Sequence, residues 1–370
     1  MANDDNRVRW RMHPEWKGHT NEQRVKKVLR SLSPDSLSSL LFAEEETDEG
    51  VAQLLEAECK AAGIPIESVK YYWYKSEFFS INANNPKPTR KEILAEIRDM
   101  MLEFSPQPEP IKRKPKVNGR LAFINSTDIH IDKVGWNAEV REDTNHRTAQ
   151  KRFRKGVAGL LSEVKTDQIS EIWLTVGSDC LNSEGRSKAT TNQTPQQVGI
   201  HFTTAYKLMK KLYIEAILTL RQIAPVKVIY VPGNHDHATG FYLAESLETY
   251  FTNYDDVSFD VEAYERKAYL WGNTFIGVLH GDKIKPQDQP NVFSEEFRPL
   301  WGQAKYTWIL NGHFHSKRLY EYANAVVRYC SAISGKEAWG YGRGYMSKAA
   351  IELFLFDKKQ GKVGEHSFNF

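Results

Sequence analysis

The stretch YVPGNHDH (residues 230–237) runs from a short apolar segment through a Pro-Gly turn into an asparagine, an aspartate and two histidines. Apolar runs that stop at such a turn are typical of buried β-strands. The chain therefore places side chains of metal-ligand type at the carboxyl end of a strand. Because sites in open α/β sheets form outside those strand ends, other strands ending in similar residues should share the same location.

Four further apolar runs end in this way, in the segments STDIHID, VGSDCLN, LHGD and NGHFHS. The carboxylate, amide and imidazole side chains at the five strand ends are Asp128, His130, Asp179, Asn182, Asn234, His235, Asp236, His280, His313 and His315. Alternation along a strand puts residues i and i+2 on one face, which favours Asp128 with His130 and His313 with His315 as ligand pairs. One such motif is common by chance, but five at successive strand ends indicate a single site.

Apolar runs alternate with helical patterns from Leu121 onward, which predicts an α/β fold with a partly antiparallel sheet. Helical spacing occupies 145–165 and 201–223. The expected strands are LAFINS, ISEIWLTVG, VKVIYVPG, NTFIGVLHG, YTWILNGH, AVVRYCSA and AAIELFLF. We divide the chain into a small helical domain (1–105), a proline-rich basic linker (106–118) and a main domain (119–370).

The composition is that of a globular protein, with 370 residues, 41% apolar and 26% charged. A net charge of +3 gives no global argument for a polyanionic partner, so any basic site must be local. No apolar run reaches the roughly 18 residues of a membrane span, and the first ten residues lack a signal-peptide core. Three widely spaced cysteines favour a reducing compartment, so we expect a cytoplasmic protein without membrane association.

The segment VAQLLEAECKAAGIPIESVKYYWYKS (51–76) predicts a helix, a Gly-Ile-Pro turn and a second helix, similar to a helix-turn-helix. The second helix would carry Lys70, Tyr71, Tyr74 and Lys75 on its recognition face. An ordinary helical hairpin is the alternative. Residues 1–105 carry net charge −3, but 7–30 carry eight basic residues against two glutamates, which keeps nucleic acid as a candidate partner.

The motifs D-x-H, G-x-D-x-x-N, G-N-H-D, H-G and G-H-x-H, in this order, resemble the calcineurin-like metallophosphoesterase superfamily over about residues 119–370. The resemblance implies a two-layer β-sandwich flanked by helices, with a dinuclear metal centre. It implies one ion held by Asp128, His130 and His315, a second held by Asn234, His280 and His313, and Asp179 bridging both. It further implies that His235 is an acid beside the leaving group and not a ligand.

Imidazole, carboxylate and amide ligands without thiolate suit Mn²⁺, the expected ion, with Fe, Zn²⁺ or Ni²⁺ as alternatives. Two such ions polarise phosphoryl oxygens and lower the pKa of a bridging water, which supplies hydroxide near neutral pH. His235 would then protonate the leaving oxygen. Asn182 and Asp236 complete the expected catalytic group.

Asn182 departs from the protein Ser/Thr phosphatase branch of the superfamily, which has an aspartate there to pair with the catalytic histidine. An amide can orient His235 but cannot stabilise its positive charge. That branch also has Arg-Gly after this position and G-N-H-E, where this chain has NSEG and G-N-H-D. A phosphoprotein substrate is therefore disfavoured.

A polar insertion, NSEGRSKATTNQTPQQV, follows the expected bridging aspartate and brings Arg186 and Lys188 as candidates for binding substrate phosphate. The alternative is a solvated loop. Its TTNQTP portion resembles an insertion in phosphoesterases of phages and prophages. The loop EAWGYGRGYMS (337–347) could also rim the site and offer Trp339, Tyr341 and Tyr345 for stacking, unless these rings pack internally.

The favoured function is dimetal-dependent hydrolysis of phosphodiester bonds in nucleic acid. The alternatives are a phosphomonoesterase or small-nucleotide phosphodiesterase whose N-terminal domain does not bind DNA, and a DNA-binding regulator with a vestigial metal site. The complete ligand set argues against the regulator. The sequence leaves the oligomeric state open.

Overall fold

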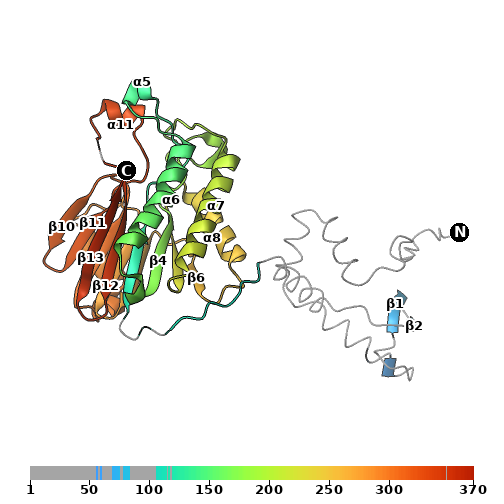
Figure 1. The fold of residues 1–370 in the computed structure, drawn as a ribbon. Coiled ribbons are helices and arrows are strands. Elements are labelled where there is room, and N and C mark those ends of the chain that lie inside the picture. The colour runs from blue at the N-terminus through green and yellow to red at the C-terminus, as the bar shows by residue number, and fades with distance from the viewer. Residues whose placement is uncertain are drawn as a thin grey trace. The chain divides into compact units, whose positions relative to one another are not determined.

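The computed structural model describes residues 56, 59–60, 69–75, 78–83, 106–114, 116, 119–346 and 348–370. The chain divides into two units, Met1–Phe104 and Ser105–Phe370. Figure 1 shows the second unit as strands covered by helices. No helix in the part of the chain that the structure describes is both long and apolar enough to cross a membrane.

In the first unit, β1 (Val69–Lys75) pairs antiparallel with β2 (Phe78–Ala83). The predicted recognition helix is therefore wrong over 69–75, where Lys70, Tyr71, Tyr74 and Lys75 lie on a strand. The segment VKYYWYK is rich in aromatic residues, which favour a pleated strand, and FFSINA supplies its partner. Of the preceding predicted helix, only Glu56, Cys59 and Lys60 are described, and these three are helical.

The larger sheet of the second unit has six strands in the order β13-β12-β3-β4-β5-β6. Strands β3 to β6 are parallel, whereas β12 runs antiparallel to both β3 and β13. The strands are β3 (Arg120–Asn125), β4 (Ile169–Gly177), β5 (Val226–Val231), β6 (Val257–Asp260), β12 (Ala350–Asp357) and β13 (Gly361–Asn369).

The smaller sheet has five strands in the order β10-β11-β9-β8-β7. Its three central strands are parallel, and the two edge strands pair antiparallel with their neighbours. The strands are β7 (Arg266–Trp271), β8 (Thr274–Leu279), β9 (Tyr306–Asn311), β10 (Arg318–Tyr322) and β11 (Ala325–Tyr329).

The two sheets pack face to face over one apolar layer. Leu121 and Phe123 of β3 join Ile276 and Leu310 of the smaller sheet in this layer. The residue between them, Ala122, belongs to a second core on the opposite face. This alternation follows from the period of two along a strand. The predicted two-layer sandwich flanked by helices is confirmed.

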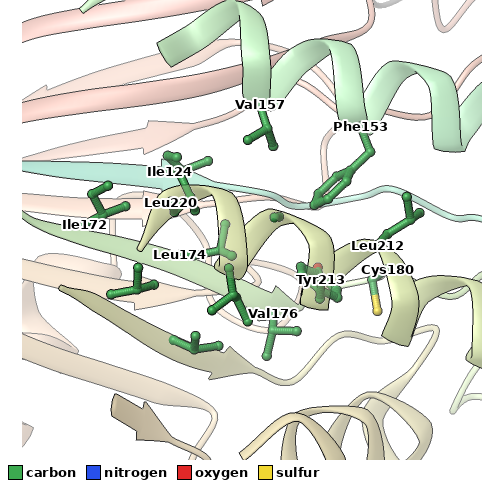
Figure 2. Close-up of a cluster of buried hydrophobic side chains, with 14 of the residues drawn as sticks. Ile124, Phe153, Val157, Ile172, Leu174, Val176, Cys180, Leu212, Tyr213 and Leu220 are labelled. Carbon is green, nitrogen blue, oxygen red and sulfur yellow. The ribbon is translucent and has the colours of Figure 1, made fainter. Parts of the chain in front are cut away.

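Helices cover both outer faces of the sandwich. On the larger sheet lie α6 (His146–Glu163), α7 (Phe202–Leu220) and α8 (His237–Tyr250), whose apolar faces all belong to one core cluster with the sheet. Figure 2 shows the part of this cluster formed by α6 and α7. On the smaller sheet lie α9 (Gln289–Glu296) and α10 (Arg298–Trp301). The short elements are α5 (Asn137–Val140), α11 (Ala338–Gly342) and two 3-10 turns, Thr166–Gln168 and Gly185–Ser187.

All seven apolar runs expected as strands form strands, and both expected helices form. The sequence reasoning missed β6, β7, β10, β13 and α8. Strand β6 has only four residues, and β13 (GKVGEHSFN) is a largely polar edge strand. Helix α8 begins directly after the site motif, so the turn residues there concealed its start.

The predicted linker contains neither helix nor strand in its described residues, 106–114 and 116. Two of its basic side chains contact residues of the predicted main domain (119–370) within the same unit. Arg113 donates to the backbone oxygen of Arg221 and pairs with Asp256. The Lys116 ammonium donates to the carbonyl oxygens of Thr166 and Ile169, both at 2.8 Å. These two charges are therefore not free to bind phosphates.

Candidate metal centre

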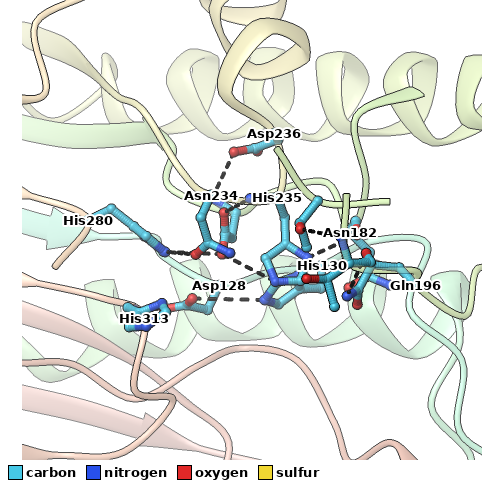
Figure 3. A network of polar contacts seen from close by, with 12 residues as sticks. Asp128, His130, Asn182, Gln196, Asn234, His235, Asp236, His280 and His313 are labelled. Atoms are coloured by element: carbon cyan, nitrogen blue, oxygen red, sulfur yellow. Dashed lines mark hydrogen bonds and ion pairs between the residues drawn. The ribbon is translucent and has the colours of Figure 1, made fainter. Parts of the chain in front are cut away.

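Backbone hydrogen bonds fasten together the loops that follow five strands. The amide of Asp128, after β3, donates to the carbonyl of Ser178 after β4 at 2.8 Å. The amide of Ser178 donates in turn to Val231, the last residue of β5, at 2.7 Å. On the smaller sheet, the amide of Gly312 donates to His280 at 2.9 Å. Figure 3 shows the side chains that these loops bring to one point.

Five of the seven expected ligands have left-handed backbone conformations. The φ angles are Asp128 54°, His130 43°, Asp179 64°, His313 67° and His315 54°. This conformation costs a residue other than glycine about 1–2 kcal/mol of conformational free energy. Strain concentrated in this way is typical of functional sites, where the surrounding structure fixes side chains at the required angle.

One group of ligand atoms comes from Asp128, His130 and His315. The Nε2 atoms of the two histidines are 3.2 Å apart, and His315 Nε2 lies 3.2 Å from Asp128 Oδ1. His130 Nε2 is 3.8 Å from the same oxygen. Two ligand atoms about 2.1 Å from one ion, at angles of about 90–110°, are about 3.0–3.4 Å apart. The two 3.2 Å separations lie in this range, and the 3.8 Å separation corresponds to a wider angle of about 130°, so the three atoms can surround one cation in a distorted geometry.

The second group comes from Asp179, His280 and His313. His280 Nε2 lies 3.0 Å from Asp179 Oδ2 and 3.0 Å from Asn234 Oδ1. The rings of His280 and His313 meet edge to face, with centroids 5.1 Å apart. Asn234 thus joins this group through its amide oxygen, as the resemblance implied. The spacing again matches ligands of one cation.

Asp179 connects the two groups, because it also forms a third group with His130 and His235. Its Oδ1 accepts a hydrogen bond from the amide of His235 at 2.8 Å, and its Oδ2 lies 3.9 Å from His235 Nε2. This third group links the other two, because it contains His130 of the first and Asp179 of the second. His235 borders the cluster rather than completing either triad.

The buried polar atoms support a cation in the first group. Asp128 Oδ1 is buried and accepts no hydrogen bond from the residues described. The other oxygen, Oδ2, accepts from Thr127 Oγ1 at 2.7 Å and from the amide of His313 at 2.9 Å. A buried carboxylate oxygen without a hydrogen-bond donor is costly unless a cation compensates it. The donor set therefore fits a divalent ion.

The pKa values of the two imidazoles of the second group shift in opposite directions. Burial lowers the pKa of His280, but the neighbouring Asp179 carboxylate outweighs it and raises the pKa to about 10. Burial and the nearby His280 lower the pKa of His313 to about 4. A histidine binds a metal only when neutral, so a cation must displace a proton from His280.

The sequence reasoning missed the groups that orient the ligands. Ser178 Oγ lies 2.9 Å from His280 Nδ1, and the same hydroxyl is 2.8 Å from Thr127 Oγ1. Such partners fix the tautomer and the ring angle of a ligating histidine. Both residues directly precede an expected ligand or bridge (Thr127-Asp128 and Ser178-Asp179), which is the signal that could have identified them.

Asp236 supports the site by binding the backbone of the loop after β4. Both of its carboxylate oxygens accept backbone amides, from Asp179 at 3.0 Å and Leu181 at 3.1 Å. Burial, with the charge of Asp179, raises its pKa to about 7. A Cβ at Gly233 would lie 2.2 Å from Asp179 Oδ1, so only glycine fits before Asn234. Asp236 holds the loops together and does not face the cluster.

Asn182 orients His235 through its backbone rather than its amide. His235 Nδ1 lies 3.0 Å from the carbonyl oxygen of Asn182. The amide nitrogen of Asn182 instead donates to the carbonyl of Gln197 at 3.1 Å. A backbone carbonyl can accept Nδ1–H whatever the side chain. The difference from the aspartate of the phosphatase branch therefore does not remove the contact that orients His235.

Arg186 and Lys188 are exposed, and their side chains make no polar contact with the ligands in the described structure. The insertion reaches the site through another residue. Both the amide and the hydroxyl of Thr191 donate to the carbonyl of Asn234 at 2.9 Å. Glu184 Oε1 accepts the amide of Ala238 at 2.8 Å, which satisfies the first turn of α8. The insertion thus braces the GNHD loop.

No family model matches the chain, and no curated protein matches its sequence. Among solved structures, an archaeal phosphodiesterase is 12% identical, with 67% of this chain and 99% of that chain covered and a TM-score of 0.33. Vps29 of Entamoeba histolytica complexed with zinc is 11% identical (68% and 98% covered, TM-score 0.29). A predicted phosphoesterase of Streptococcus pneumoniae is 12% identical (68% and 99%, 0.27). At these values the matches carry no argument about activity.

Proposed function

We propose that the chain is a dimetal-dependent phosphoesterase that hydrolyses phosphodiester bonds of nucleic acid. The observation that carries the proposal is the convergence of ligand atoms in three groups, each within 4.8 Å, which are linked through His130 and Asp179. Carboxylate, imidazole and amide donors without thiolate suit Mn²⁺ and related ions. A pair of divalent ions supplies activated water and polarises the phosphoryl oxygens of an ester.

The residues of the site would have two roles, metal binding and proton transfer. Asp128, His130 and His315 would hold one ion, and Asn234, His280 and His313 the other, with Asp179 shared. The carbonyl of Asn182 accepts Nδ1–H, so His235 would carry a second proton on Nε2, the atom 3.9 Å from Asp179 Oδ2, in its positively charged imidazolium form. From there it can protonate the oxygen of the leaving group.

A polyanionic substrate is favoured by the local charge of the chain. Residues 7–30, which lie outside the described structure, carry eight lysines and arginines against two glutamates. Such a segment binds phosphates in a way that depends on salt. Nucleic acid supplies both the phosphodiester and the run of charges. The expected helix-turn-helix does not support this substrate, since 69–75 form a strand.

The test is a substrate panel with the full chain loaded with Mn²⁺. The panel contains bis-p-nitrophenyl phosphate, p-nitrophenyl phosphate, cyclic nucleotides, single-stranded DNA, plasmid and RNA. We expect hydrolysis of the bis ester and of at least one nucleic acid. The matched control is Asp179→Asn, which removes the shared carboxylate charge at nearly constant volume. This variant should be inactive on every substrate.

Three results would contradict the proposal. Turnover of p-nitrophenyl phosphate alone would identify a phosphomonoesterase. Hydrolysis of cyclic nucleotides without any nucleic acid would identify a small-nucleotide phosphodiesterase. Absence of turnover on the entire panel, with both ions bound, would remove the enzymatic proposal altogether.

A further inference from the structure

An exposed aromatic and basic patch lies on α11 and the turn after it. Trp339 and Tyr345 are 59% and 62% exposed, and their ring centroids are 5.7 Å apart. The guanidinium carbon of Arg343 lies 4.2 Å from the centre of the Trp339 ring. We call these three residues the α11 patch. Large aromatic side chains usually bury most of their surface, so a solvent-facing pair beside an arginine indicates a binding surface.

The α11 patch is tied to the metal centre at its N-terminal end. The amide of Ser334 donates to the carbonyl oxygen of Asp128 at 3.1 Å. Glu337, which precedes α11, pairs with Lys133 at 3.7 Å in the loop that follows His130. Five residues span at most about 18 Å, so Trp339 lies within that distance of Ser334. Figure 1 shows α11 beside α5 at one end of the unit.

The other end of the same loop borders a basic hollow. Lys348 lines a hollow of about 330 Å³ together with Ser331, Asn369, Ser316 and Lys317. Ser316 and Lys317 directly follow the ligand His315. Lys317 pairs with Glu352 at 3.1 Å, whereas Lys348 is exposed and has no polar contact in the described structure. The unpaired positive charge of Lys348 therefore lies on the same hollow as Ser316, the residue after the ligand His315.

This combination matches one chemical class of ligand. Unpaired nucleobases stack on aromatic rings and arginine planes, while the backbone phosphates pair with lysines. A duplex hides the base faces and cannot use such rings. Arg343 and Lys348 also disfavour an apolar partner that lacks acidic groups. Such a partner would bury their positive charges without counter-charges.

We propose that the α11 patch is a stacking platform for unpaired bases of a single-stranded nucleic acid, whose backbone passes Lys348 toward the metal centre. This inference rests on the proposed function, because it names the form of the substrate at the same site. It makes the substrate a single strand or a locally unpaired segment. The bases that stack on the α11 patch belong to nucleotides that flank the hydrolysed phosphodiester.

The test measures binding without hydrolysis. Fluorescence anisotropy of a labelled twelve-nucleotide oligo-dT is titrated with the full chain in EDTA, over a salt series. Trp339→Ala should weaken binding by about 5- to 150-fold, the range given by the loss of one stacked base. Trp339→Phe should restore most of the affinity. Tyr264→Ala is the matched control, since Tyr264 is 67% exposed and lies outside the patch.

The salt series and a duplex distinguish stacking from charge. Trp339→Ala should leave the salt slope unchanged, whereas Lys348→Gln should reduce it. Affinity for a duplex of the same length should not change in Trp339→Ala. Equal losses on single strand and duplex, or no loss on the single strand in a variant with an unchanged melting temperature, would overturn the inference. Failure of the proposed function is a separate result, since it is read from turnover of the wild-type protein.

Discussion

His130 and His315 lie 185 residues apart in the chain, yet their Nε2 atoms face each other at 3.2 Å. Both are close to Asp128 Oδ1, a buried oxygen that accepts no hydrogen bond in the described structure. When one of the two neutral imidazoles carries its proton on Nε2, that single N–H can donate to the other ring or to Asp128 Oδ1, but it cannot serve both contacts fully. A cation held by all three atoms resolves the contact, and the left-handed backbone at each of these residues fixes the angles.

The first prediction concerns metal stoichiometry. The wild-type chain should bind two divalent ions, and His315→Ala should retain one, because it removes a ligand of the first group only. Asp179→Asn should lower the occupancy of both, since the carboxylate serves both groups. Elemental analysis after loading with Mn²⁺ and gel filtration measures these ratios. Equal losses in the two variants would contradict the shared role of Asp179.

The second prediction separates proton transfer from metal binding. His235→Ala should lower kcat by about 10²–10⁴-fold on an ester with a poor leaving group while both ions remain bound. The loss should be much smaller on bis-p-nitrophenyl phosphate, because nitrophenolate leaves without a proton. The comparison of kcat on DNA and on the bis ester measures the difference. Equal losses on both substrates would rule out the acid role.

Asn182→Ala is the companion variant. Because the carbonyl of Asn182 and not its amide contacts His235, the orienting contact should survive the substitution. We expect a loss of less than about tenfold in kcat, well below that of His235→Ala. If the two variants lose activity equally on DNA, the amide has a direct role that the geometry does not indicate.

The third prediction tests the hydroxyl behind a ligand. Ser178→Ala removes the contact to His280 Nδ1 at 2.9 Å and should reduce metal affinity by about 10- to 100-fold. Ser294→Ala is the control, because its hydroxyl bonds only to Asn291 within exposed α9. Titration with Mn²⁺, followed by calorimetry, compares the two. Unchanged affinity in Ser178→Ala would show that packing alone fixes the imidazole.

The fourth prediction concerns stability and pH at Asp260. Its carboxylate accepts from Lys267 and from Tyr269, each at 2.5 Å. Burial raises the pKa of Asp260, but the Lys267 and Tyr269 contacts outweigh it and lower the pKa below its ordinary 3.8. The stabilisation is therefore complete above about pH 4 and is lost as the pH falls through the folded-state pKa.

Asp260→Asn should thus lower the free energy of unfolding by about 2 kcal/mol at pH 7. The difference from wild type should shrink as the pH falls below about 4 and through the lowered folded-state pKa, because the wild-type carboxyl then takes up a proton. Urea unfolding at pH 7 and at pH 3 measures it. A difference that is the same at both pH values would show that the contact does not depend on the charge.

The local sequence pattern was sufficient to predict the main strands of the sandwich. Runs such as LAFIN and VKVIYV are buried on both faces, so their apolar side chains are continuous and stand out from the turns. The convergence of the candidate ligands was also predictable, because each of them follows one of these strands. The segment VKYYWYK was wrongly predicted as a helix, because its antiparallel pairing with FFSINA outweighs its local helical pattern.

The sequence by itself determined which residues can bind a cation and that strand ends carry them. Only the tertiary structure decided that the carbonyl of Asn182 contacts His235, that Asp236 braces the loops, and that Arg186 and Lys188 remain in solvent. The physical reason is that residue type fixes the chemistry a side chain offers. Its direction depends on backbone angles and on hydrogen bonds between loops distant in the chain, which no local pattern encodes.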